Sequence, residues 1–440
     1  MKNSFCFFYL LILTINSYCQ DGKSNEINNW INNNPGELIP IRIEFNENIN
    51  CYEHNQQFKI NQTSLDQRAK TINRLLKHQA LKSQKNILSF LKENTGSPNQ
   101  YHSFWIVNII VALVDLPTLN KLHQFTNILS IKIENNKFIA HDELKISSNN
   151  NRTPNGVENG LIAINAPAMW SLGYTGRGRL AYNYDTGVWP DHPAFSKRFI
   201  GERFPMQQSW IGYFNSFPNG SIQNHGTHTL GTIAGLVGST NDTIGVAFGA
   251  YWIANDFVTP TVQELPPIVN MINAFEWALN PDNDSNTTKD IPDVINNSWR
   301  WYDGNDTIHC DGYIVNLMNA IEAAGIANIF SGGNSGPNNM TVNSPQRINT
   351  SEVNTFCVGS VNGNSSFPYP ISNFSTKGPS QCPGTGSLAI HPEVVAPGQN
   401  VRSAWDQNNF NTISGTSMAA PHVSGAVLLL KEAFPYLTGE

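Results

Sequence analysis

Three short motifs, far apart in the chain, carry residues that could do chemistry. Asp185 ends an apolar run and precedes Thr-Gly, His225 stands in the motif HGTHTLGT, and Ser417 stands in GTSMAAPH. A serine hydroxyl attacks a carbonyl when a base takes its proton. Histidine is the natural base near neutral pH, and a carboxylate can orient it. We therefore predict that the three residues act together, with Ser417 as the nucleophile.

Each motif also has a plain structural interpretation. Ser417 could be an ordinary residue at a helix N-terminus, and Asp185 a solvated turn residue. His225 could be a core histidine or could bind a metal with His228, but no third ligand lies near that pair in the sequence. We predict no metal site here, and we expect structural roles for the other histidines near these motifs: His192, His228 and His422.

The elements around Ser417 and a glycine-rich turn could stabilise an oxyanion. We expect Thr416 to cap a buried helix that ends before Pro435, and the N-terminus of that helix favours negative charge. Asn334 lies in FSGGNSG after a predicted strand at 327–330, and its side-chain amide could donate to the same oxyanion. The alternative is a glycine-rich turn with a left-handed asparagine.

Short apolar strands alternate with helical segments in the second part of the chain. This order predicts an α/β fold with a mostly parallel central sheet covered on both faces, and functional residues then gather at the carboxyl ends of the strands. The predicted strands are 180–184, 246–254, 294–297, 327–330 and 355–361, and the predicted helices are 227–236, 268–279 and 313–324.

The first part of the chain predicts a small α+β domain. Its expected elements are a strand at 38–45, one or two helices in 65–91, a β-rich run at 101–114, a helix at 116–125, and a hairpin of 128–133 with 137–140. The composition of residues 149–160 is typical of a linker and indicates a proteolytic junction.

Composition and the N-terminus indicate an exported protein. The 440 residues are 40% hydrophobic and 14% charged, and the net charge of −6 argues against nucleic acid as a partner. Residues 1–20 have the pattern of a secretory signal, with Lys2 before a short apolar stretch. We expect a secreted, soluble protein; attachment to the cell surface through Cys19 is the alternative.

The cysteines suggest one disulfide. Cys310 and Cys382 lie in loop-like sequence, and an exported protein can keep a disulfide, so we hypothesise that they pair. Cys357 lies in a predicted buried strand, where a free thiol behaves as a small hydrophobe.

The order Asp, His, Asn, Ser in these motifs resembles the subtilases, the subtilisin-like serine peptidases. The resemblance implies a subtilisin-like three-layer fold at residues 151–440, preceded by a signal peptide at 1–20 and a propeptide region at 21–150. The propeptide region would hold a ferredoxin-like inhibitor domain at about 60–140. Asp185 would orient His225, His225 would act as general base, Ser417 would attack, and Asn334 would donate to the oxyanion. The residues implied to bind substrate are Ser298, Trp299, Arg300, Ser331, Gly332 and Gly333.

The implied activity is hydrolysis of peptide bonds through an acyl-enzyme, by an endopeptidase made as an autoinhibited zymogen. Its partners would be protein or peptide substrates and its own propeptide, with no nucleic acid and no membrane after signal cleavage. A catalytically inactive binding protein of the same fold is the alternative, and esterase or transpeptidase action by the same chemistry is a third.

The sequence departs from the family at several places. Asn183 replaces an aliphatic residue and needs a hydrogen-bond partner if it is buried. No cofactor is required by the predicted chemistry. Ala194 stands where many subtilases have a calcium-ligating Asp, which argues against calcium although the loop at 240–246 resembles the other half of that site.

Two further departures concern the cleft and the C-terminus. Trp299, Arg300 and Trp301 replace small residues, so we expect a narrower cleft and a preference of Arg300 for acidic or aromatic side chains. The chain stops at Glu440, where subtilases normally continue, and we expect a truncated C-terminus.

Overall fold

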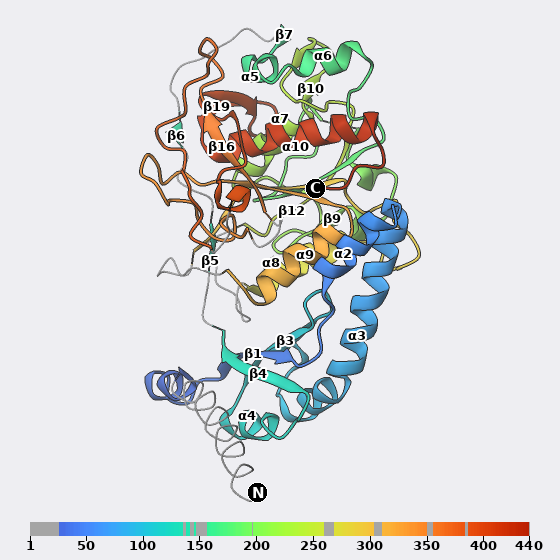
Figure 1. Ribbon diagram of the computed structural model, residues 1–440, viewed down its shortest axis with the longest axis vertical. Helices are drawn as coiled ribbons and strands as arrows, with labels where there is room; N and C mark the ends of the chain where they lie inside the picture. The colour runs from blue at the N-terminus through green and yellow to red at the C-terminus, as the bar shows by residue number, and fades with distance from the viewer. Residues whose placement is uncertain are drawn as a thin grey trace, which may run out of the picture. The chain divides into compact units, whose positions relative to one another are not determined.

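The computed structural model describes most of the chain in two compact units (Figure 1). The described residues are 26–134, 138–140, 145–146, 156–195, 197–258, 268–302, 310–349, 355–382 and 386–439. One unit comprises residues 1–49, 76–136 and 262–269, and the other comprises 50–75, 137–261 and 270–440. The predicted signal at 1–20 lies outside the described residues.

The smaller unit contains a four-stranded antiparallel sheet in the order β2-β3-β1-β4. Its strands are β1 (Ile39–Phe45), β2 (Tyr101–Phe104), β3 (Ile109–Val114) and β4 (Ile128–Ile133). The second half of α3 (Leu65–Asn94) and α4 (Leu116–Leu122) share one apolar core with these strands. With both helices between the strands in sequence, this order is that of a ferredoxin-like α+β domain.

One expectation for the N-terminal region was wrong. β5 (Phe138–Ala140) does not form a hairpin with β4 but pairs antiparallel with β14 (Arg300–Tyr302). Closeness in sequence suggested the hairpin, but a strand can pair with any open edge. One further helix was not expected: α2 (Cys51–Ile60) is largely polar and packs against α9 (Tyr313–Ala323).

The larger unit is built on a seven-stranded sheet in the order β17-β16-β15-β13-β8-β12-β9, in which every pairing is parallel. The predicted strand at 246–254 begins only at residue 251, because residues 247–249 form a turn. The strands are β8 (Leu180–Tyr184), β9 (Trp210–Ile211), β12 (Tyr251–Asn255), β13 (Val294–Asn297), β15 (Ala327–Ser331), β16 (Phe356–Val361) and β17 (Val394–Pro397).

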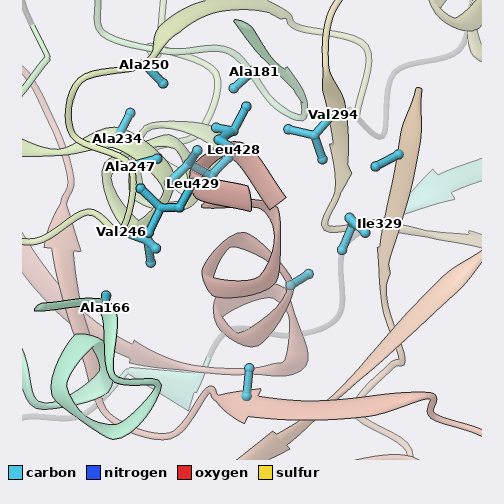
Figure 2. Close-up of a cluster of buried hydrophobic side chains, with 14 of the residues drawn as sticks. Ala166, Ala181, Ala234, Val246, Ala247, Ala250, Val294, Ile329, Leu428 and Leu429 are labelled. Carbon is cyan, nitrogen blue, oxygen red and sulfur yellow. The ribbon is translucent and has the colours of Figure 1, made fainter. Parts of the chain in front are cut away.

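Helices cover both faces of this sheet. α7 (His225–Ala234) and α10 (Thr416–Ala433) pack on each other (Figure 1) and share a core with Ala181 of β8, Val294 and Ile329. Figure 2 shows Val294 and Ile329 beside Leu428 and Leu429 of α10. On the other face, Tyr182 and Tyr184 contact rings of α8 (Ile268–Leu279). Successive side chains of β8 therefore point to opposite faces of the sheet, and each face is covered by a layer of helices, as in the predicted three-layer fold.

Smaller elements complete the unit. β7 (Gly156–Val157) and α5 (Asn159–Ala163) occupy the end of the predicted linker, whose residues 149–155 lie outside the described residues. The other elements are β6 (Lys145–Ile146), α6 (Ala166–Ser171), β10 (Leu236–Val237), β11 (Asp242–Thr243), β18 (Val401–Ala404) and β19 (Phe410–Ser414). No helix in the described part of the chain is long and apolar enough to cross a membrane.

The predicted disulfide is confirmed. Cys310 and Cys382 are bonded, with their Cα atoms 5.3 Å apart. Cys357 lies buried in β16 and forms no disulfide, as expected for a thiol that serves as a small apolar side chain.

Candidate active site

Asp185 follows directly after β8, at the carboxyl end of the central sheet. Its backbone N–H donates to Oδ1 of Asn255 at 2.9 Å, and its Oδ1 accepts the N–H of Thr186 at 2.8 Å. The side chain is buried. These two bonds hold the backbone and the side chain of Asp185 in place.

His225 is the first residue of α7, and its ring is oriented by Asp185. Nδ1 of His225 lies 2.7 Å from Oδ1 of Asp185, and both side chains are buried. Gly226 permits this approach, because a Cβ at that position would lie 2.2 Å from the carbonyl oxygen of Gly187. Nδ1 faces the carboxylate, which leaves Nε2 on the opposite edge of the ring as the group that can exchange a proton.

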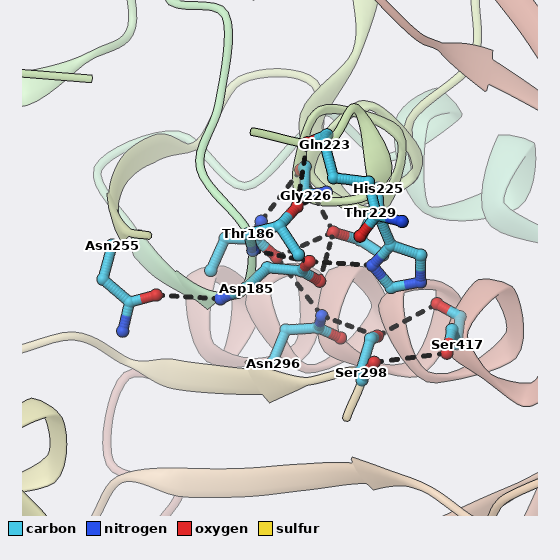
Figure 3. A network of polar contacts seen from close by, with 11 residues as sticks. Asp185, Thr186, Gln223, His225, Gly226, Thr229, Asn255, Asn296, Ser298 and Ser417 are labelled. Carbon is cyan, nitrogen blue, oxygen red and sulfur yellow. Dashed lines mark hydrogen bonds and ion pairs between the residues drawn. The ribbon is translucent and has the colours of Figure 1, made fainter. Parts of the chain in front are cut away.

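Ser417 is the second residue of α10, in its first turn. Figure 3 shows the His225 ring between the carboxylate of Asp185 and the side chain of Ser417. Oγ of Ser417 donates to the carbonyl of Ser298 at 3.2 Å, and Oγ of Ser298 donates to the carbonyl of Ser417 at 3.0 Å. The predicted cap was off by one residue: Gly415 is the N-cap, and Thr416 already belongs to the helix.

Asn334 follows β15 and lies against the start of α10. Its Oδ1 accepts both the N–H of Thr416 at 2.9 Å and the Thr416 hydroxyl at 3.0 Å. These two donors fix the amide plane, and Nδ2 lies 3.2 Å from where a Cβ on Gly415 would be. Asn334 thus lies beside the helix N-terminus that carries Ser417.

Among the predicted substrate-binding residues, Ser298 is the one whose contact with Ser417 the described structure shows. Ser298 contacts Ser417 directly, and Arg300 begins β14, the strand that pairs with β5. Ser331 ends β15, and Gly332 after it packs closely against its neighbours, because a Cβ on Gly332 would lie 2.8 Å from the Thr376 hydroxyl.

The expectation that the Trp299 side chain narrows the cleft was wrong. The indole is 1% exposed and packs among the rings of Tyr184, Phe275 and Phe330. Trp301 is buried as well. Large aromatic side chains point into the core because burial of their apolar surface is favourable.

The other histidines contact backbone carbonyls. Nε2 of His228 lies 3.1 Å from the carbonyl of Val401, and Nδ1 of His422 lies 2.8 Å from that of Met418. Burial lowers the pKa of His228 to about 3 and that of His422 to about 4, so both are neutral near pH 7. Nε2 of His192 lies 3.0 Å from the carbonyl of Asn409.

The loop at 240–246, which resembles half of a calcium site, does not fit a calcium ion. Arg402 in β18 donates to Oδ2 of Asp242 at 2.8 Å and to Oδ1 at 3.2 Å, and it also donates to Glu158 at 3.0 Å. Calcium needs six to eight oxygen ligands. A guanidinium already takes the carboxylate oxygens of this loop, and Ala194 supplies no side-chain oxygen.

Comparison with known proteins places the chain in a family. The model of the subtilase family matches residues 184–440. The chain belongs to the subtilase family. This family consists of serine-type endopeptidases, and the resemblance drawn from the three motifs is therefore confirmed.

Individual relatives extend the similarity towards the N-terminus. Bacillopeptidase F of Bacillus subtilis (strain 168) is 31% identical over 382 residues, which cover 81% of this chain and 25% of that protein. Alkaline proteinase of Hapsidospora chrysogena is 30% identical over 351 residues, which cover 77% of this chain and 75% of that protein. Subtilisin E of Bacillus subtilis (strain 168) is 27% identical over 337 residues, which cover 76% of this chain and 73% of that protein. This subtilase spans about a quarter of bacillopeptidase F and about three quarters of the other two.

Asn183 has the partner that its burial was expected to require: its Nδ2 donates to the carbonyl of Gly226 at 2.9 Å. Sequence reasoning missed the roles of Thr229 and Asn255, which with Asn296 complete a polar network around Asp185 (Figure 3). The sequence signal that could have indicated this network was the presence of polar residues at strand and helix positions that the fold buries.

Proposed function

We propose that this subtilase is a serine endopeptidase that hydrolyses peptide bonds through an acyl-enzyme. Ser417 attacks the carbonyl, His225 takes its proton and later delivers it to the leaving amine, and Asp185 stabilises the imidazolium. Asn334 and the N-terminus of α10 stabilise the oxyanion. The observation that carries the proposal is the 2.7 Å contact between Nδ1 of His225 and Asp185, on a ring that lies beside Ser417.

We further propose that the protein is made as an autoinhibited zymogen. β5 pairs antiparallel with β14, the strand that begins at Arg300 beside the site. An extended peptide that adds a strand to an open edge is a common way to bind a peptide in a cleft. The propeptide segment at Phe138–Ala140 therefore occupies an edge that an extended substrate would use.

The position of β6 suggests where the propeptide is cut. β6 pairs with β19, the strand that ends just before Gly415 and Ser417. Residues 138–140 thus pair with β14, and residues 145–146 pair with the strand that leads into Ser417. We propose that cleavage falls between Ala140 and Lys145, earlier than the junction at 149–160 that composition suggested.

Export and metal independence complete the proposal. The charged and apolar pattern of residues 1–20 supports secretion. The ion pair of Arg402 with Asp242 supports a protein that needs no calcium at the loop 240–246.

Autoprocessing tests the proposed function. The wild type and a Ser417→Ala variant are secreted from the same host, and their intact masses and N-terminal sequences are determined. We expect the wild type to lose its propeptide by a cut within 141–145 and the variant to remain uncut. A variant processed at the same bond as the wild type would contradict self-cleavage, and a folded wild type that stays uncut and inactive would favour the binding-protein alternative.

A further inference from the structure

Thr229 lies one helical turn after His225 and faces the carboxylate of Asp185. The residue is fully buried, and its Oγ1 lies 3.1 Å from each of three acceptors: Oδ2 of Asp185, Oδ1 of Asn183 and the carbonyl oxygen of Gly226. A hydroxyl has one proton to donate, so only one of these acceptors can receive it. The neighbouring bonds decide which one does.

The other two acceptors, the carbonyl of Gly226 and Oδ1 of Asn183, each have a second donor nearby. Its Nδ2 donates to the carbonyl of Gly226 at 2.9 Å, and this bond fixes the amide, because the flipped amide would set two oxygens against each other. Oδ1 of Asn183 then faces Nδ2 of Asn296 at 3.3 Å. Both acceptors that compete for the Thr229 proton therefore already have a donor.

The orientation of Asn296 is fixed by Ser298. Nδ2 of Asn296 lies 3.1 Å from Oγ of Ser298, whose own proton goes to the carbonyl of Ser417, so this oxygen accepts from the amide. Oδ1 of Asn296 then lies 3.0 Å from the hydroxyl of Ser424 on α10, which also has the carbonyl of Ala420 at 3.2 Å as an acceptor. Asn296 on β13 therefore donates to Asn183 on β8.

The two oxygens of Asp185 have different partners. Oδ1 receives the Thr186 N–H and faces Nδ1 of His225, and the bond that reaches Oδ2 comes from Thr229. On the proposed endopeptidase function, we propose that Thr229 is a positioning residue that holds Asp185 by donating to Oδ2, and that Asn183 directs the Thr229 proton to it.

This assignment predicts how the His225–Asp185 pair titrates. Loss of a donor to Oδ2 makes the carboxylate a stronger acceptor for the proton shared with His225, so the pair is protonated at higher pH. The rate of attack by Ser417, which needs neutral His225, then falls off at a higher pH than in the wild type.

The other charged groups around this pair leave the prediction unchanged. His228 on the same helix and His422 on α10 stay neutral, because burial lowers the pKa of each far below 7. Asp256 follows Asn255 on the other side of Asp185 and is held by the backbone N–H groups of Tyr213 and Asn215.

The test compares the pH dependence of labelling by a fluorophosphonate probe, which requires no knowledge of the substrate. The variants are Thr229→Val, which keeps the shape and removes the hydroxyl, and Thr229→Ser, which keeps the hydroxyl. Thr232→Val is the matched control, because Thr232 is buried on the same helix and its hydroxyl donates to the carbonyl of His228 at 3.2 Å, away from Asp185. All are measured after propeptide removal.

We expect Thr229→Val to slow labelling about tenfold at neutral pH and to raise the midpoint of the acid limb by about half a pH unit, with Thr229→Ser close to the wild type. Asn183→Val should shift the midpoint in the same direction and add little to Thr229→Val, because both act through one bond. Should Thr229→Val fail to fold, Thr229→Ala against Thr229→Ser gives the same comparison.

Other outcomes would overturn the inference. An unchanged midpoint in folded Thr229→Val, or an equal shift in Thr232→Val, would reduce Thr229 to a packing residue. A wild type that takes up no probe would instead refute the proposed endopeptidase function, which this inference presupposes.

Discussion

The buried contact of Arg402 with Asp242 predicts that an ion pair stabilises the loop at 240–246. Asp242 is 1% exposed, and Arg402 bonds both of its carboxylate oxygens. Removing one partner of such a pair leaves a buried charge without compensation, which typically costs about 3–5 kcal/mol. We therefore expect Arg402→Met to lower the free energy of unfolding by about that amount.

The assay is thermal and urea unfolding of the full chain in a Ser417→Ala background, which prevents self-digestion. The double variant Arg402→Met/Asp242→Leu should recover more than half of the loss, because the fully buried carboxylate of Asp242 is then gone; the half-buried Glu158 still loses its bond to Arg402. The midpoint of thermal unfolding of the protein with Arg402 and Asp242 intact should be the same in buffer with calcium and in buffer with EDTA.

Two results would refute this reasoning. A loss below about 1 kcal/mol for Arg402→Met would mean that the pair behaves like an exposed one. A wild-type midpoint that falls in EDTA, and recovers with calcium, would mean that a metal ion stabilises the domain.

Three further predictions concern other parts of the larger unit. Burial raises the pKa of Glu393 to about 7, so the folded state keeps a proton that the unfolded chain loses above pH 4.5. Stability should therefore fall as pH rises from about 5 to 7, and Glu393→Gln should remove that part of the slope in urea unfolding; an unchanged slope would contradict it. Cys382→Ser should cost about 2–5 kcal/mol of stability by breaking the bond to Cys310, measured by thermal unfolding with the reduced wild type as the comparison. Asn334→Ala should slow peptide hydrolysis about a hundredfold to a thousandfold with little change in KM, and a full-rate variant would exclude Asn334 as the oxyanion donor.

Much of the larger unit could be predicted because its signals are local. The limits of β8, α8 and β13 follow from runs of apolar residues, and His225 and Ser417 start helices where their motifs indicated. Local patterns of this kind specify which element forms. They also placed the four expected catalytic residues at strand ends and helix starts.

The remaining features depend on partners that are distant in sequence. Arg402 and Asp242 are 160 residues apart, and β5 pairs with a strand that is as far away. The direction of the Trp299 side chain depends on the space beneath the sheet, which three other elements define. Polar residues such as Asn183 and Thr229 can be recognised as a hydrogen-bond network only once the fold is known to bury them, because exposed residues of the same type would bond to water instead.

The most direct test of the central claim is labelling of the secreted, propeptide-cleaved protein with a fluorophosphonate, read by peptide mass spectrometry. We expect one modified residue, Ser417, with no labelling in Ser417→Ala and strongly reduced labelling in His225→Ala. Folded, processed wild type that remains unlabelled, or is labelled equally well without His225, would contradict the assignment of Ser417 as an activated nucleophile.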